Sequence, residues 1–195
     1  MGILAKYVRE TSAYEVYAKN NKPILNLVTI SLFVTFTSIC SQISIPLPFT
    51  PIPINLAMIS VFMSGYILGS AKGALSQVVY ILLGCIGVPV FANFHSGVGI
   101  IVGQTGGYII GYIAASFIVG LFAKDNRHIA IIGLSMMFGL LACYFLGTMW
   151  FIILTKTKIF ETLLICVIPF LLGDVLKIIL SIFLLRRIKD MHSLK

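Results

Sequence analysis

Two oppositely charged residues, Asp174 and Lys177, lie within an otherwise apolar stretch near the C-terminal end of the chain, ICVIPFLLGDVLKIILSIFLL. Because they are three positions apart, a helix would project both side chains from one face, about one turn apart. Each would cost about 2.5–3.5 kcal/mol at the centre of a membrane helix on insertion scales. The pair therefore either neutralises itself as a buried ion pair or faces a polar ligand, with Asp174 accepting N–H donors and Lys177 donating to an oxygen. We favour the ligand, since ionisable residues inside a membrane segment usually mark a functional site.

Other groups that could perform catalysis are scarce. Neither paired carboxylates, nor a nucleophile beside a base, nor a metal-like cluster of Cys and His is visible in the sequence. The phosphate-binding pattern G-x-x-x-x-G-K-[ST] does not occur, and the nearest stretch, GYILGSAKG (65–73), fails it. We therefore expect a binding protein without a cofactor. An intramembrane enzyme that uses Asp174 and Lys177 as acid and base is the alternative.

The elements that must position this pair are membrane helices, because 59% of the 195 residues are apolar and only 10% are charged. Six apolar runs are long enough to approach or exceed the length of a membrane span. We expect an all-α integral membrane bundle of six transmembrane helices in a single membrane domain over residues 1–195. The helices fall in 24–185, and the tails are 1–23 and 186–195. The runs are 24–43, 53–69, 72–90, 103–123, 128–153 and 160–185.

Residues 3–18 have apolar positions at helical spacing with charges between them. This pattern is compatible with a helix on the cytoplasmic membrane surface and equally with a partly ordered tail. Small residues recur at every fourth position in several runs, for example at Gly103, Gly107 and Gly111, and this spacing lets helices approach one another closely.

Lysines and arginines set the orientation. The two tails carry eight of these residues. The link between the second and third apolar runs carries one, and the link between the fourth and fifth runs carries two, which makes 11 of the 14. Positive residues are retained on the cytoplasmic side, so both termini are predicted to be cytoplasmic. The net charge of +8 is then a consequence of membrane topology, and we expect a lipid bilayer, not nucleic acid, as the surroundings.

This topology places two loops, 43–53 and 90–103, on the external side. Both are rich in residues that stop helices, with four prolines in the first, and we expect ordered non-helical loops that close over a ligand from outside. Polar and aromatic side chains from these loops and the next helix could converge on the charged pair and complete a small-molecule pocket. They are Phe49, Thr50, Phe91, Asn93, Phe94, Gln104, Thr105 and Tyr108.

Four segments occur in an order and spacing that resemble a known family. They are IPLPFTPIPINL (45–56), GYILGSAKGALSQVVYILLGCIGVPVFANF (65–94), GQTGGYIIGY (103–112) and Asp174-x-x-Lys177. The sequence resembles BioY, the family of biotin-binding substrate-capture (S) subunits of energy-coupling factor (ECF) vitamin transporters. The resemblance covers most of residues 24–185.

The resemblance implies that the protein lies in the plasma membrane and captures external biotin. It also implies a transmembrane coupling subunit and two cytoplasmic ATPases as partners. A stand-alone carrier for another small vitamin-like solute is a further alternative.

The resemblance also implies roles for individual residues. Asp174 would accept the ureido N–H groups, and Lys177 would bind either the ureido carbonyl or the valerate carboxylate. The remaining residues would supply hydrogen bonds (Asn93, Gln104 and Thr105) or pack on the bicyclic ring (Phe49, Phe91 and Tyr108). Tyr80 matches the family pattern and belongs either to the site or to the core.

Overall fold

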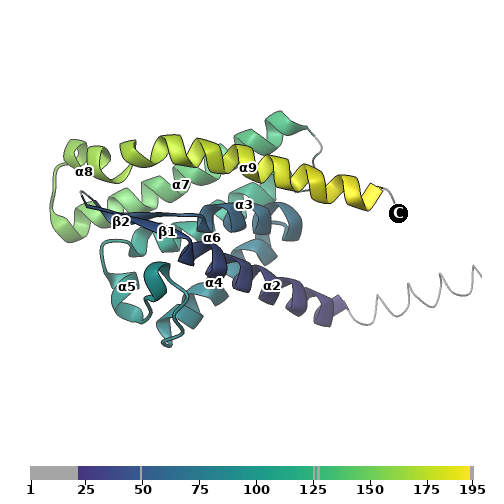
Figure 1. The fold of residues 1–195 in the computed structure, drawn as a ribbon, viewed down its shortest axis with the longest axis horizontal. Coiled ribbons are helices and arrows are strands. Elements are labelled where there is room, and N and C mark those ends of the chain that lie inside the picture. Colours follow the sequence, from purple (N-terminus) through teal and green to yellow (C-terminus); the bar gives the residue numbers. More distant parts are fainter. Residues whose placement is uncertain (1–21, 49, 125, 127, 194–195) are drawn as a thin grey trace, which may run out of the picture.

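The computed structural model describes residues 22–48, 50–124, 126 and 128–193, and its main elements are apolar helices (Figure 1). The longer helices of this part of the chain are α2 (Lys22–Gln42), α3 (Ala57–Leu68), α4 (Ser70–Cys85), α6 (Gly106–Ala123), α7 (Ile129–Thr155) and α9 (Ile168–Ser193). Shorter elements are β1 (Ser44–Leu47), β2 (Thr50–Asn55), η1 (Ala92–Phe94), α5 (Val98–Val102) and α8 (Ile159–Cys166).

Four of the described helices, α2, α6, α7 and α9, are long and apolar enough to cross a membrane. The apolar helices α3 and α4 have 12 and 16 residues. At about 1.5 Å per residue they are shorter than a hydrocarbon core of about 30 Å. The six apolar runs thus all contain helices, but only four of these helices meet the length of a span. The predicted surface helix over residues 3–18 lies outside the described residues.

The first proline-rich loop departs from the all-α expectation, because it contains a two-stranded antiparallel hairpin. Ser44 pairs with Asn55 and Ile45 with Ile54, and the register shifts between Ile45 and Leu47. Proline cannot donate to a strand ladder, but in a sheet of two strands each strand has a free edge that tolerates it. The helix expected over 53–69 therefore begins only at Ala57.

The last apolar run, expected as one helix over 160–185, is broken into α8 and α9. The backbone leaves the helical region at Val167, with φ −126° and ψ −55°. Pro169 follows in the first turn of α9, where its missing N–H costs no hydrogen bond. Because of the break, α8 folds back as a separate short element at the end of the bundle (Figure 1).

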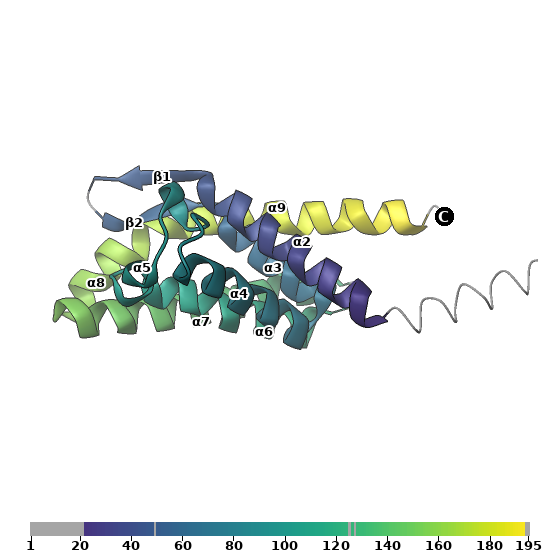
Figure 2. The same ribbon diagram turned by 90° about the horizontal axis from the view of Figure 1, so that it is seen from below.

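Glycines on the inner faces let the helices approach closely. A Cβ on Gly65 of α3 would meet the Ser116 carbonyl of α6, and one on Gly120 would meet the backbone nitrogen of Ser70. Figures 1 and 2 show α2 beginning and α9 ending at one end of the molecule, with α5, α8 and the hairpin toward the other.

Replacing Gly120 by Ala should therefore destabilise the bundle, because the added methyl group would have to displace backbone atoms. Such overpacking costs about 1–3 kcal/mol, which corresponds to at least about 2 °C in the thermal midpoint. The matched control is Gly133→Ala on α7, whose Cβ would meet only the end of Ile182 at 3.6 Å. Thermal unfolding of the purified variants in one detergent measures the difference, and equal midpoints would contradict this account of the packing.

Candidate ligand-binding site

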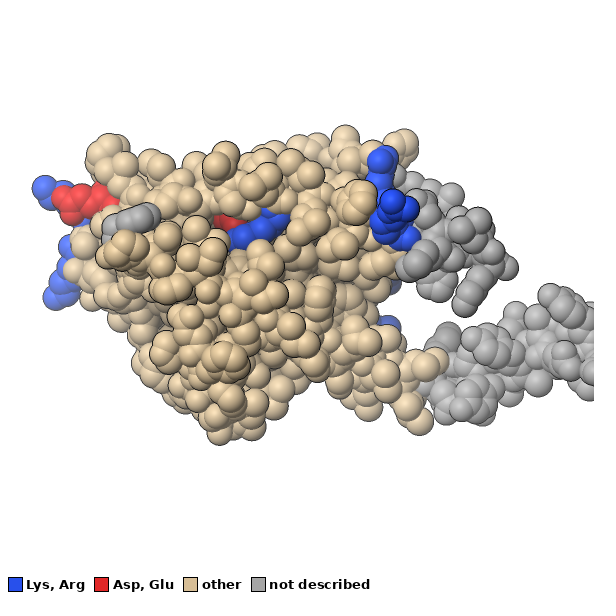
Figure 3. All heavy atoms as spheres, viewed as in Figure 1, with Lys and Arg blue, Asp and Glu red and all other residues tan. Residues whose placement is uncertain are grey.

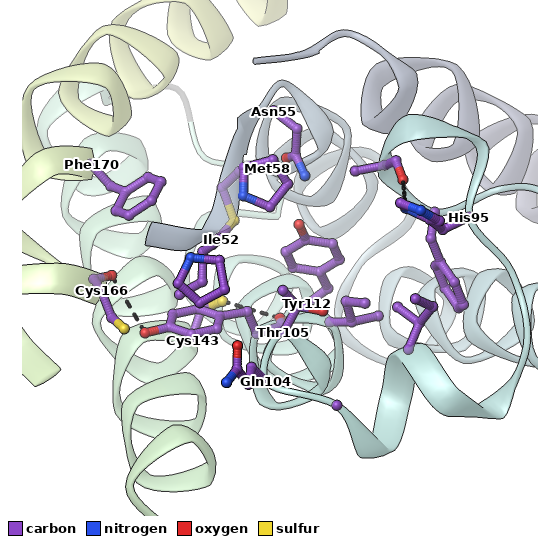
Figure 4. A pocket seen from close by; sticks show the side chains of 18 of the residues that line it. Ile52, Asn55, Met58, His95, Gln104, Thr105, Tyr112, Cys143, Cys166 and Phe170 are labelled. Carbon is purple, nitrogen blue, oxygen red and sulfur yellow. Dashed lines mark hydrogen bonds between the residues drawn. The ribbon is translucent and has the colours of Figure 1, made fainter. Parts of the chain in front are cut away.

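One cavity of about 310 Å³ lies where the two loops meet the helix bundle. Its volume is at the lower end of the range of roughly 300–1,000 Å³ that small-molecule sites occupy. Figure 4 shows Asn55 and Met58, Tyr112, Cys166 and Phe170 around the same space, although they come from distant parts of the chain. The site is therefore assembled from both loops and from α3, α4, α6, α7, α8 and α9.

The charged pair of α9 lines this cavity. The Lys177 ammonium lies 2.6 Å from Oδ1 of Asp174, and the two residues are only 8% and 5% exposed. The hydroxyl of Tyr144 on α7 donates a hydrogen bond to the other oxygen, Oδ2. The two residues thus pair with each other and at the same time face a cavity. On the face drawn in Figure 3, charged atoms otherwise gather at the two ends of the molecule.

Aromatic side chains form one wall. The rings of Tyr80 and Phe91 meet edge to face, with centroids 5.6 Å apart and planes at 83°. Gly84 makes this contact possible, because any Cβ there would clash with the Phe91 ring. The Tyr80 hydroxyl donates to the carbonyl of Val90 at 3.2 Å. Tyr80 is therefore part of the core and of the cavity wall at once.

Hydrogen bonds fix the link that carries Gln104 and Thr105, which both line the cavity. The indole N–H of Trp150 on α7 donates to the Gly103 carbonyl at 2.9 Å. Three residues after Thr105, the hydroxyl of Tyr108 lies 3.3 Å from Oγ1 of Thr148 and 3.4 Å from the Cys166 carbonyl. These contacts tie the start of α6 to α7 and to the end of α8.

The structure brings eight of the nine predicted site residues to the cavity: Tyr80, Phe91, Asn93, Gln104, Thr105, Tyr108, Asp174 and Lys177. The ninth, Phe49, lies outside the described residues. Two further residues that we expected to converge do not line it. Thr50, in β2, is buried, and the side chain of Phe94 is 72% exposed.

Sequence reasoning missed several lining residues, notably Asn55, Tyr112 and Tyr144. Tyr112 follows Tyr108 by four positions, a spacing that places both on one helical face and could have identified it. Tyr144 had no such signal, since a tyrosine in an apolar helix is equally at home in a core. Together the lining offers a carboxylate, an ammonium, amides and hydroxyls among apolar groups, which suits an organic ligand that has both donors and acceptors.

Comparison with known proteins gives related matches. "Probable biotin transporter BioY" of Pyrococcus horikoshii is 36% identical over 160 residues, which is 82% of this chain and 93% of that protein. "Biotin transporter BioY" of Thermotoga maritima is 34% identical over 166 residues, covering 85% and 96%. A crystal structure of the S-component for biotin from an ECF-type ABC transporter superposes with a TM-score of 0.80 at 26% identity, covering 88% of this chain and 94% of that one.

The family model described as the BioY family matches residues 12–193. This match includes both loops, the cavity they help to enclose and the charged pair of α9. It therefore extends over the whole candidate site and not over the apolar helices alone. The chain belongs to the BioY family.

Proposed function

We propose that this chain binds biotin in the cavity and serves as the substrate-specific subunit of an ATP-driven uptake transporter. The observation that carries the proposal is the buried Asp174–Lys177 pair, which faces a cavity bounded by the loops 43–53 and 90–103. The protein captures and passes on its ligand without altering it, so no residue is assigned a catalytic role.

The hydrogen-bonding capacity left in the pair fits the ureido group of biotin, which has two N–H donors and one carbonyl. A carboxylate offers about four lone-pair sites, and Lys177 and Tyr144 occupy one on each oxygen of Asp174. Two sites are left for the two N–H groups. Lys177 has three donors and spends one on Asp174, so it also retains donors for a carbonyl or a carboxylate of the ligand.

The remaining predicted contacts follow from the lining. Asn93, Gln104 and Thr105 supply further hydrogen bonds, while Phe91 and Tyr108 pack against the bicyclic ring and Tyr80 supports Phe91 by its edge-to-face contact. Such a combination of a largely apolar wall and a few oriented polar groups gives affinity from burial and selectivity from hydrogen bonding.

The proposal includes the arrangement in the membrane. The end of the bundle where α2 begins and α9 ends carries the exposed cations Lys72, Lys124, Arg186 and Arg187, and we assign it to the cytoplasm of the cell. The six long helices form one membrane domain between two cytoplasmic tails, in the plasma membrane. The sequence contains no phosphate-binding loop with which the chain could use ATP itself. A transmembrane coupling subunit and two cytoplasmic ATPases then supply the energy for uptake.

Asp174→Asn and Lys177→Met should each weaken biotin binding at least about tenfold, which is about 1.4 kcal/mol. Each change leaves the partner buried without its counter-charge and removes a hydrogen bond to the ligand. Equilibrium titration of the purified protein with biotin, beside other vitamins, measures the effect. Lys158→Met, which removes an exposed lysine away from the cavity, is the matched control. Wild-type titration curves for both cavity variants would remove the pair from the site.

Tyr144→Phe should weaken biotin binding about tenfold, because it removes the hydroxyl that orients the Asp174 carboxylate and keeps the ring. The effect should vanish in an Asp174→Asn background, where there is no carboxylate to orient. Titration of the two single variants and the double variant gives the coupling energy. Fully additive effects would mean that Tyr144 acts independently of Asp174.

The orientation predicts which engineered cysteines react from outside intact cells. A cysteine at Ser96, in the second external loop, should react with a membrane-impermeant maleimide. One at Ala71, in the first turn of α4, should react only after permeabilisation. Both positions are exposed, and labelling of the unaltered chain gives the background from its own cysteines. The reverse pattern would invert the topology.

A further inference from the structure

The segment 89–95, here called the cavity loop, has an unusual backbone. It supplies Phe91, Ala92, Asn93 and His95 to the cavity lining. Asn93 and Phe94 both have left-handed backbone angles, with φ 57° and 58°. Asparagine tolerates this region, but phenylalanine rarely adopts it. Such a conformation costs about 1–3 kcal/mol and persists only where surrounding contacts enforce it.

The side chain of Gln42, the last residue of α2, contacts the backbone before this left-handed turn and within it. Its Nε2 donates to the carbonyls of Pro89 and Phe91, at 3.1 and 3.0 Å. Its Oε1 accepts a hydrogen bond from the backbone N–H of Phe94 at 2.9 Å. One side chain thus holds both the backbone before the strained pair and an amide within the pair, and it uses the donor and acceptor ends of its own amide together.

Neighbouring contacts come from the same end of α2 and from β1. Ser41 donates to the Val90 carbonyl, and the Ser44 hydroxyl lies 2.8 Å from Oδ1 of Asn93. The hydrogen bonds within the cavity loop, such as Phe91 N to the His95 carbonyl at 3.1 Å, shape the loop but cannot attach it to the bundle. In Figure 2 the loop after α4 rises beside the end of α2.

We propose that Gln42 is a positioning residue for ligand binding: its side-chain amide holds the cavity loop in its left-handed conformation against the cavity. Gln42 does not line the cavity, so it acts through the loop and not through a contact with the ligand. The inference rests on the proposed function only in naming biotin as the ligand that the loop retains.

A consequence concerns the rates of binding. The cavity loop covers the ligand, so loosening the loop speeds both the entry of the ligand into the cavity and its exit. Loss of a direct contact between protein and ligand would speed the exit alone. Because Gln42 ends a helix long enough to cross the membrane, the position of α2 sets how firmly the loop is held. At its other end α2 is held by a 2.6 Å hydrogen bond from Lys72 to Asn26.

The direct test is Gln42→Met, which keeps the length of the side chain and removes all three hydrogen bonds. The rate of biotin release from the purified protein should rise about tenfold, since each hydrogen bond contributes roughly a factor of 2–10. The association rate should rise as well. Thr35→Val is the matched control, because the Thr35 hydroxyl bonds only to the Ser31 carbonyl within α2. A wild-type rate of release from Gln42→Met, or an association rate that does not rise, would overturn the proposal.

A second measurement needs no ligand. Hydrogen–deuterium exchange of the peptide containing Phe94 should accelerate at least about threefold in ligand-free Gln42→Met, with peptides from α6 and α7 unchanged. Unchanged exchange at Phe94 would overturn the proposal, whatever the binding data show. If Gln42→Met fails to fold, Ser44→Ala, which loosens the same loop through Asn93, must show the same changes at smaller size, and wild-type behaviour would again overturn it.

The two proposals fail in different ways. If the wild-type chain does not bind biotin, the proposed function fails, and the exchange experiment still decides the role of Gln42. If the wild-type chain binds biotin but Gln42→Met releases it at the wild-type rate, only the positioning role fails.

Discussion

The ion pair between Asp174 and Lys177 is the constraint on which the rest of the architecture depends. Either charge alone inside a membrane protein is costly, whereas a close pair with further hydrogen bonds offsets much of that cost. The pair is satisfied by its own 2.6 Å contact and by the Tyr144 hydroxyl. An empty cavity therefore leaves neither charge without a partner, and the carboxylate keeps lone pairs for a ligand. A binding site that must exist both empty and occupied needs this property.

The same reasoning extends to the backbone of the cavity loop. Non-helical backbone near a membrane is stable only where its polar groups find partners in the protein. The carbonyls of Pro89, Val90 and Phe91 receive such partners from side chains at the end of α2 and from Tyr80. Polar residues at the end of α2 therefore hold the backbone of this loop, a role that the residues next to them in the sequence do not indicate. A residue such as Gln42 affects the cavity without touching it.

The parts that could be predicted from the sequence are those with a local chemical cause. The spacing of Asp174 and Lys177, the prolines of the first loop and the apolar runs lead directly to the charged pair, the non-helical loop and the helices. The hairpin was not predicted, because prolines at alternate positions remove the usual signs of a strand. The helix break at Val167 was not predicted, because it lies inside a single apolar run and hydropathy does not mark it. The role of Tyr144 depends on α7 and α9 being neighbours, and only the fold supplies that information.

The chemistry of the lining also bears on how such a site selects its ligand. The charges of Asp174 and Lys177 cancel, so net charge attracts a ligand only weakly and selectivity must come from matched donors and acceptors. A site built to hydrogen-bond its ligand rejects analogues that lack the matching group by large factors, because its own buried groups are then left unpaired. Asp174, at 5% exposure, has little access to water that could replace a missing N–H donor. The burial that makes the pair expensive is therefore also the source of its discrimination.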